Sequence, residues 1–180
     1  MKTYRLILIV LISTLSISLS AFGVTPIDSS NWLSHPSIKE IRLIFSEVQK
    51  MKLNHELVAK SKKFDYCEPY QDMEREILLD DSEIPRYYSY SAGSDDSAIT
   101  WQFYYDQSGN LRFAFITAKA VNKTKIEHRI YFNAKGERIW EIQKLIEGPG
   151  YTFPRNHWPD ADIVKNPIER FNSQNGCPEL

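Results

Sequence analysis

Apolar residues recur at helical spacing between positions 37 and 51. Their three- and four-residue intervals place them on one face of a helix: Ile38, Ile41, Ile44, Phe45, Val48 and Met51. Ser37 and Glu40 have the spacing of a capping box, and Pro36 comes just before it. The pattern predicts a core-packing helix, followed by a second, weaker helix over residues 56–64.

Beyond residue 73 the pattern changes to segments rich in aromatic and β-branched residues, separated by short polar turns. We expect strands over residues 76–79, 86–90, 99–105, 111–118, 126–132 and 138–145. Sequential strands with short connections usually pair with each other. The chain therefore predicts an antiparallel meander of about six strands.

Two of the turns share a sequence cassette, Tyr104–Gly109 and Tyr131–Gly136. Each holds an aromatic pair, then Asp or Asn, and Gly three residues later. Asp or Asn opens a type I turn, and Gly takes the left-handed conformation that closes a bulged hairpin.

The turns also predict the register of each hairpin. In the first hairpin we expect large apolar pairs on the core face: Tyr105–Leu111, Phe103–Phe113 and Trp101–Phe115. In the second we expect the pairs Ile130–Trp140, His128–Ile142 and Arg129–Glu141, with His128 toward the core. This register places Tyr104, Arg112, Arg129 and Tyr131 on the outer face, together with Thr100, Gln102, Ala114, Ile116 and Glu141.

The predicted fold is a single α+β domain over residues 24–180, in which the N-terminal helix packs on the meander in two layers. Residues 24–35 are polar and irregular and read as a mobile leader. Residues 146–180 lack periodicity and are rich in Pro and aromatic residues. We expect them to form an irregular arm that wraps the body.

The N-terminus has the form of a secretory signal peptide. Lys2 and Arg5 precede a short apolar run over residues 6–12 and a Ser-rich stretch. Small residues favour cleavage after Gly23, with Ser20 as the alternative site. An uncleaved membrane anchor is the other interpretation, although a spanning helix needs about 20 apolar residues. A periplasmic or secreted location follows, with no membrane span after cleavage.

The two cysteines of the chain, Cys67 and Cys177, would meet an oxidising compartment after export. We predict one disulfide between them that fixes the C-terminal arm, and a catalytic thiol is the alternative. The full chain has a formal net charge of −1, and removal of the signal peptide with its two basic residues leaves −3. This balance gives no electrostatic footprint for nucleic acid.

No catalytic signature is present, and the four histidines lack metal-ligand spacing. We therefore expect no metal and no cofactor. His128 is a weak candidate for a general base because it is titratable yet predicted on the core face. Its alternative role is that of a hydrogen-bonded histidine at the edge of the core. The outward-facing Tyr104, Tyr131 and Arg129 are candidate ligand-binding residues, since exposed aromatic side chains anchor partners.

The cassettes Tyr105-Asp106-x-x-Gly109 and Phe132-Asn133-x-x-Gly136 resemble the hairpins of YD-type repeat proteins and of uncharacterised small secreted or periplasmic bacterial α+β domains. A helix followed by a meander also resembles cystatin-like and PepSY-like folds. Those folds imply binding of proteins or peptides, or inhibition of enzymes. We expect non-enzymatic binding of a protein, peptide or glycan in the cell envelope, with an envelope hydrolase that uses His128 as the alternative.

Overall fold

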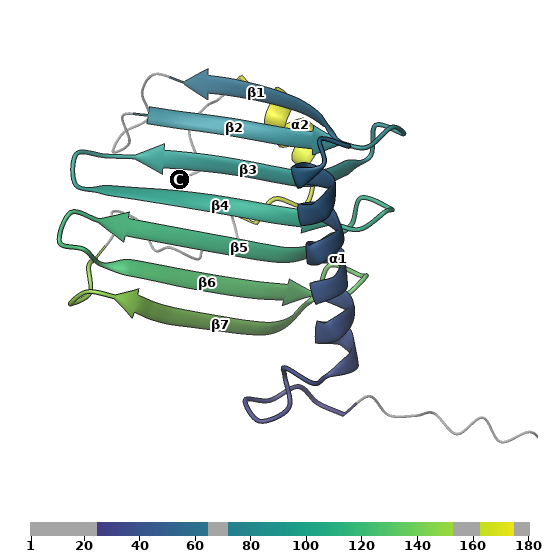
Figure 1. Cartoon of the computed structure of the whole chain (residues 1–180), viewed down its shortest axis with the longest axis horizontal. Coiled ribbons are helices and arrows are strands. Elements are labelled where there is room, and N and C mark those ends of the chain that lie inside the picture. Colours follow the sequence, from purple (N-terminus) through teal and green to yellow (C-terminus); the bar gives the residue numbers. More distant parts are fainter. Residues whose placement is uncertain (1–24, 65–71, 153–162, 175–180) are drawn as a thin grey trace, which may run out of the picture.

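The computed structural model describes residues 25–64, 72–152 and 163–174. A long helix precedes a seven-stranded antiparallel sheet, and a short helix follows it (Figure 1). The elements are α1 (Pro36–Leu53), β1 (Val58–Phe64), β2 (Asp72–Leu79), β3 (Pro85–Gly93), β4 (Ser97–Tyr105), β5 (Leu111–Ala120), β6 (Lys125–Phe132), β7 (Arg138–Glu147) and α2 (Pro167–Asn172). The strands lie in the order of the sequence, so the predicted α+β meander is confirmed.

The sheet has one strand more than predicted because residues 58–64 form β1 rather than a second helix. β1 pairs along its whole length with β2, from Val58 opposite Leu79 to Phe64 opposite Met73. Helix propensity is a weak preference, and main-chain pairing with the edge of an existing sheet overrides it here. The chain leaves α1 through His55, whose φ of 55° is left-handed and ends the helix.

Helix α1 buries the predicted apolar stripe, with Ile38, Ile41 and Val48 among its buried residues. Its N-cap is His35, whose Nδ1 accepts a hydrogen bond from Ser37 N at 3.3 Å. The predicted capping box is therefore wrong: Glu40 instead forms an ion pair with Arg112 at 2.8 Å. Within the described part of the chain, no helix is long and apolar enough to cross a membrane.

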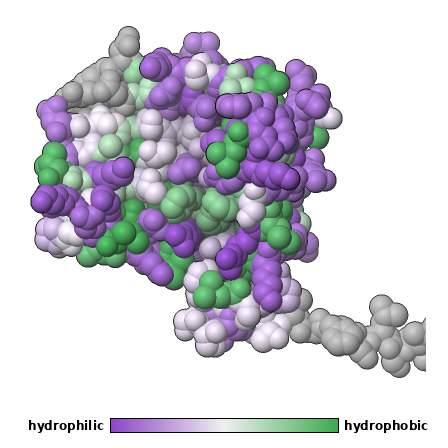
Figure 2. All heavy atoms as spheres, viewed as in Figure 1, coloured by the Kyte–Doolittle hydropathy of each residue, from purple (hydrophilic) through white to green (hydrophobic). Residues whose placement is uncertain are grey.

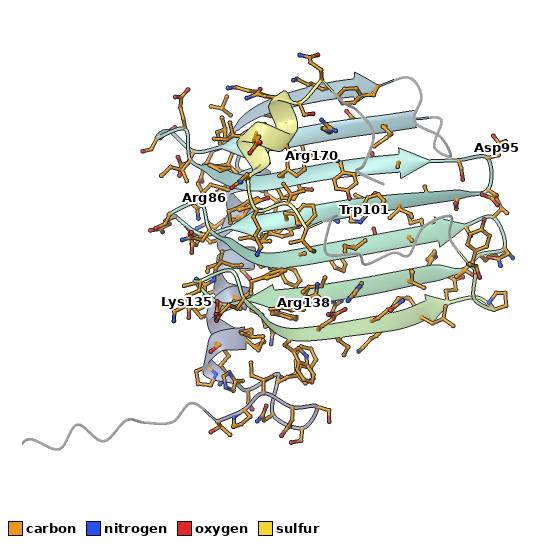
Figure 3. All side chains as sticks on the ribbon, turned by 180° about the vertical axis from the view of Figure 1, so that it is seen from behind. Arg86, Asp95, Trp101, Lys135, Arg138 and Arg170 are labelled. Atoms are coloured by element: carbon orange, nitrogen blue, oxygen red, sulfur yellow. The ribbon has the colours of Figure 1, made fainter. Side chains whose placement is uncertain are left out.

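The two faces of the sheet carry separate apolar clusters. The cluster between α1 and the sheet joins helix and strand residues: Ile38, Ile41 and Val48 of α1, and Leu78, Tyr87, Tyr104, Phe113 and Tyr131 of the sheet. The opposite face holds a larger cluster that includes Tyr88, Tyr90, Trp101, Phe103, Tyr105, Ile130, Phe132 and, from the C-terminal region, Val164 and Phe171. α1 and α2 lie on opposite sides of the sheet (Figures 1 and 3). The helix and the C-terminal segment thus cover different faces.

Three hairpin turns at the α1 end of the sheet are built in the same way. In each, the Oδ1 atom of Asp80, Asp106 or Asn133 accepts backbone hydrogen bonds from the residues two and four positions later, at 2.9–3.0 Å. Gly109 and Gly136 have the predicted left-handed φ of 78° and 75°. The first turn has Glu83 in that place, with φ 59°, so it lacks the glycine by which the other two were recognised.

Each of these turns is followed by a bulge of one residue. The register shifts between Leu78 and Leu79, between Tyr104 and Tyr105, and between Tyr131 and Phe132. The extra residues on the partner strands are Arg86, Arg112 and Ile139. A bulge places two residues of one strand opposite one residue of the other. Every later residue therefore pairs one position further along than it would without the bulge, and the other set of side chains comes onto its face.

Because of the bulges, most of the predicted strand pairs are wrong. Tyr105 does lie opposite Leu111, but the next pairs are Tyr104–Phe113, Phe103–Ala114 and Trp101–Ile116. In the second hairpin the pairs are Tyr131–Trp140, Ile130–Glu141, Arg129–Ile142 and His128–Gln143. Phe113 and Phe115 therefore share the α1 face with Tyr104 and Tyr131, whereas Trp101 and Phe103 lie on the other face.

The predicted outer face is thus partly core. Tyr104 has no exposed surface and Tyr131 has 4%, because α1 covers both rings. Arg112 is also buried and pairs with Glu40 and with Asp106. Of Tyr104, Arg112, Arg129 and Tyr131, only Arg129 is partly exposed.

Candidate binding cleft

Helix α1 crosses the strands near one end of the sheet and leaves the rest of that face open (Figure 1). A cleft of about 250 Å³ lies where the helix meets the open face. We call it the aromatic cleft; its lining residues are Ile41, Arg42 and Phe45 of α1, Phe113 and Phe115 of β5, and Arg129 and Tyr131 of β6. In the space-filling view of this face, green apolar surface beside α1 is surrounded by hydrophilic side chains (Figure 2).

The floor of the aromatic cleft is a set of packed rings around Phe113. Its ring stacks on Phe115 with a centroid distance of 6.3 Å, and Phe45 meets it edge-on at 5.5 Å. Tyr131 lies at 4.9 Å on the next strand. Each ring is held by neighbours on two elements, so the floor is formed before any ligand arrives.

Two guanidinium groups flank this apolar floor, one from the helix and one from the sheet. Arg129 lies over the Phe115 ring at 5.4 Å and pairs with Glu127 at 2.6 Å. Arg42 is exposed and has no carboxylate within 4.0 Å among the described residues. Burial raises the pKa of Tyr131, and both guanidiniums act on its hydroxyl in the opposite direction. The cleft therefore combines an apolar floor with a positive rim.

Beyond the aromatic cleft the open face is polar. It carries the partly exposed Ser89, Ser91, Thr100, Gln102 and Thr117, and three glutamates are strand partners of these residues: Glu74, Glu76 and Glu127. A hydrogen-bond network joins this region to the core. Tyr104 Oη accepts from Gln49 Nε2 at 2.7 Å and donates to Gln102 Oε1 at 3.0 Å. Burial raises the pKa of Tyr104 far above its ordinary value, so its hydroxyl keeps its proton.

The structure separates the predicted ligand-binding residues. Tyr131 and Arg129 both line the aromatic cleft, but Tyr104 lies beneath α1 and has no exposed surface. The sequence pattern does not identify the other five lining residues: it assigns Ile41, Phe45, Phe113 and Phe115 to the core and gives no role to Arg42. A one-residue bulge after the turn is the signal that would have placed Phe115 on the face of Tyr131.

His128 lies on the opposite face of the sheet and has no exposed surface. Its Nε2 atom is 2.6 Å from Glu141 Oε1, and Glu141 Oε2 accepts from Arg138 Nη1 at 2.7 Å. Arg138 is the first residue of β7 and follows the β6–β7 turn (Figure 3). Glu141 thus pairs with His128 and Arg138, and the predicted Arg129–Glu141 pair is wrong.

Burial lowers the pKa of His128 below its ordinary value of 6.5, because the charged imidazolium loses hydration there, although Glu141 favours the charged form. The folded protein therefore binds fewer protons at this site than the unfolded chain does. The contribution to stability is complete above about pH 6.5 and is lost as the pH falls through that value toward the lower pKa of the folded state.

We expect the unfolding free energy to fall between about pH 7.5 and about pH 5, and to fall less in the His128→Gln variant. Urea denaturation of both proteins at the two pH values measures the difference. Equal pH dependence of the two proteins would contradict a lowered pKa at His128.

Other candidate sites add no further chemistry to the described residues. No group of three or more His, Cys, Asp or Glu side chains that could hold a metal ion occurs among them. Asp96, in the loop between β3 and β4, accepts hydrogen bonds from Ser94 Oγ at 2.9 Å and from Tyr151 Oη. Cys67, Cys177 and the predicted signal peptide lie outside the described residues, so the disulfide and the cleavage site remain predictions.

We compared the chain with protein-family models, with curated proteins and with solved structures, and none of the three comparisons gives a significant match.

Proposed function

We propose that the chain is a non-enzymatic binding protein of the cell envelope, periplasmic or secreted after signal cleavage. Its site is the aromatic cleft, and its ligand is a protein or peptide that inserts an apolar side chain between α1 and the sheet. The location rests on the N-terminal sequence, and the mode of binding rests on the cleft.

The observation that carries this proposal is the partly exposed Phe115 ring within a preformed cleft. The Phe115 ring stacks on the buried Phe113, lies under the guanidinium of Arg129 and is otherwise partly exposed to solvent. A concave site with an apolar floor and a few charged groups at its rim is the usual form of a ligand site. Aromatic and arginine side chains are also those that most often dominate the energy of protein interfaces.

The envelope-hydrolase alternative rests on the pair between His128 and Glu141. That pair has the distance of an acid–base dyad, but the imidazole has no exposed surface. A general base must reach the proton that it abstracts, directly or through one water. The aromatic cleft is open to solvent and lies on the other face, so we favour the binding function.

Selection of phage-displayed random peptides on the wild-type protein tests this proposal, with one library that presents free peptide C-termini and one that presents internal peptide segments. We expect enrichment of peptides with a large apolar residue, and we expect Phe115→Ser to weaken their binding by about tenfold or more, the scale of an aromatic anchor. Thr117→Ala is the matched control, because Thr117 lies on the same strand and face but outside the cleft. Peptide binding by each variant is measured by fluorescence anisotropy.

Phe115 is partly exposed, so Phe115→Ser should leave the fold intact, which a far-ultraviolet circular dichroism spectrum checks. Failure to enrich peptides above an unrelated protein would refute the proposal. So would peptides that bind Phe115→Ser as tightly as the wild type.

A further inference from the structure

We infer that the aromatic cleft receives the C-terminal residue of a partner polypeptide, with the apolar side chain on the ring floor and the free α-carboxylate beside Arg42 and Arg129. This inference rests on the proposed function and specifies the chemical group that is bound.

The size and depth of the cleft suit one large side chain. Its volume is about 250 Å³, and its deepest lining residues are buried: Ile41 has no exposed surface, and Phe113 has 6%. A phenylalanine or leucine side chain fits in a space of this order. The cleft can therefore receive a large apolar group.

The charges at the rim call for an anion next to that apolar group. Arg42 and Arg129 supply two positive charges, and Glu127, which pairs with Arg129, supplies one negative charge. Arg42 has no carboxylate within 4.0 Å in the part of the chain that the structure describes. A carboxylate that arrives at the rim would be the first acidic partner of Arg42 and would accept charge-assisted hydrogen bonds.

The arrangement of α1 favours a chain end over an internal acidic residue. α1 stands as a wall along one side of the cleft, and β5 and β6 below it are both paired on their two edges. A bound peptide therefore finds no free strand edge for main-chain pairing at the cleft, and α1 blocks its continuation on one side. A chain that ends at the cleft can enter from the open face. Its last residue carries the apolar side chain and the α-carboxylate on the same carbon, so the two groups can reach the ring floor and the arginines together.

Four synthetic probes separate the possible ligands. N-acetyl-Gly-Gly-Phe with a free carboxylate is the proposed ligand type, and its C-terminal amide removes the charge alone. N-acetyl-Gly-Gly-Gly removes the apolar group alone, and 3-phenylpropanoate keeps the ring and the carboxylate without the peptide. Binding is measured by isothermal titration calorimetry and by NMR shifts of the cleft residues.

We expect the free acid to bind about tenfold more tightly than the amide, since a partly exposed charge pair contributes modestly. The triglycine and 3-phenylpropanoate should both bind more weakly than the free acid. Arg42→Gln should remove the preference for acid over amide, whereas Lys50→Gln, which removes the same charge from an exposed position two turns further along α1, should keep it. Glu127→Gln should strengthen binding of the acid.

The other outcomes overturn the inference in distinguishable ways. Equal binding of the acid and the amide at the cleft would show that the carboxylate is not recognised, and it would leave the proposed function in place. Binding of 3-phenylpropanoate as tight as that of the peptide would make a small aromatic carboxylate the ligand. If none of the probes binds while phage selection yields internal peptide sequences, the chain-end proposal fails alone. If phage selection yields no peptides either, both proposals fail.

Discussion

Replacement of Tyr104 by alanine is expected to lower the free energy of unfolding by about 3–5 kcal/mol, the usual cost of removing a buried aromatic ring. Tyr104 has no exposed surface. Its ring contacts those of Phe45 at 4.9 Å, Tyr87 at 5.2 Å and Phe113 at 5.7 Å. The truncation leaves a cavity between α1 and the sheet, which urea denaturation would measure as a lower midpoint.

Tyr104→Phe is the matched control because it keeps the ring and removes only the hydroxyl. Gln49 and Gln102 then each lose a partner, and both are partly exposed and can bind water instead. We expect a loss of about 1 kcal/mol. A Tyr104→Ala variant as stable as the wild type would return Tyr104 to the outer surface, where the sequence pattern had placed it.

Local chemistry explains why the hairpins, but not their faces, were predictable. Asp106 and Asn133 bond to the backbone two and four residues later, and the turns therefore form from local sequence alone. Whether a bulge forms after each turn depends on the interactions that the side chain of its extra residue makes. Arg112, the extra residue of the second bulge, pairs with Asp106 of its own turn and with Glu40 of α1. The second of these partners is distant in sequence, so the bulge was not visible in the hairpin itself.

Two such ion pairs match the position of α1 on the sheet, where its buried apolar residues pack. Arg86 and Arg112 occupy the same place in hairpins two strands apart and pair with Glu47 and Glu40. Two strand spacings are about 10 Å, and seven residues of helix rise by about the same distance. The spacing of the two glutamates therefore matches the repeat of the turns, with α1 lying across the strands at that end of the sheet.

The third hairpin has Ile139 where the other two have arginine. A third glutamate at the same spacing would stand seven residues before Glu40, and that position lies before the first residue of α1. Trp32 packs there instead, stacked on Trp140 at 6.3 Å and near Tyr131 at 6.2 Å. The aromatic cleft depends on this placement of the helix, since its walls come from α1, β5 and β6. The lining residues come from three elements that are separate in the sequence, so only Tyr131 and Arg129 could be predicted from the sequence pattern.

The last prediction concerns Gly148, which follows β7 and has a left-handed φ of 84°. A β-carbon at this position would lie 2.7 Å from the backbone of Thr124 and 2.9 Å from that of Lys123. Both contacts are with the backbone of the β5–β6 turn, and Thr124 has no exposed surface, so neither can be relieved by turning a side chain. Gly148→Ala therefore combines an unfavourable backbone conformation, about 1–2 kcal/mol, with overpacking of about 1–3 kcal/mol.

Gly136→Ala separates the two contributions. Gly136 has a similar φ of 75°, but nothing lies within 4 Å of the added β-carbon, so only the backbone cost of about 1–2 kcal/mol applies. Urea denaturation of both variants should place Gly148→Ala well below Gly136→Ala in stability. Equal losses would mean that the β5–β6 turn moves away from residue 148 at no cost, and that the close approach of β7 to this turn does not constrain the fold.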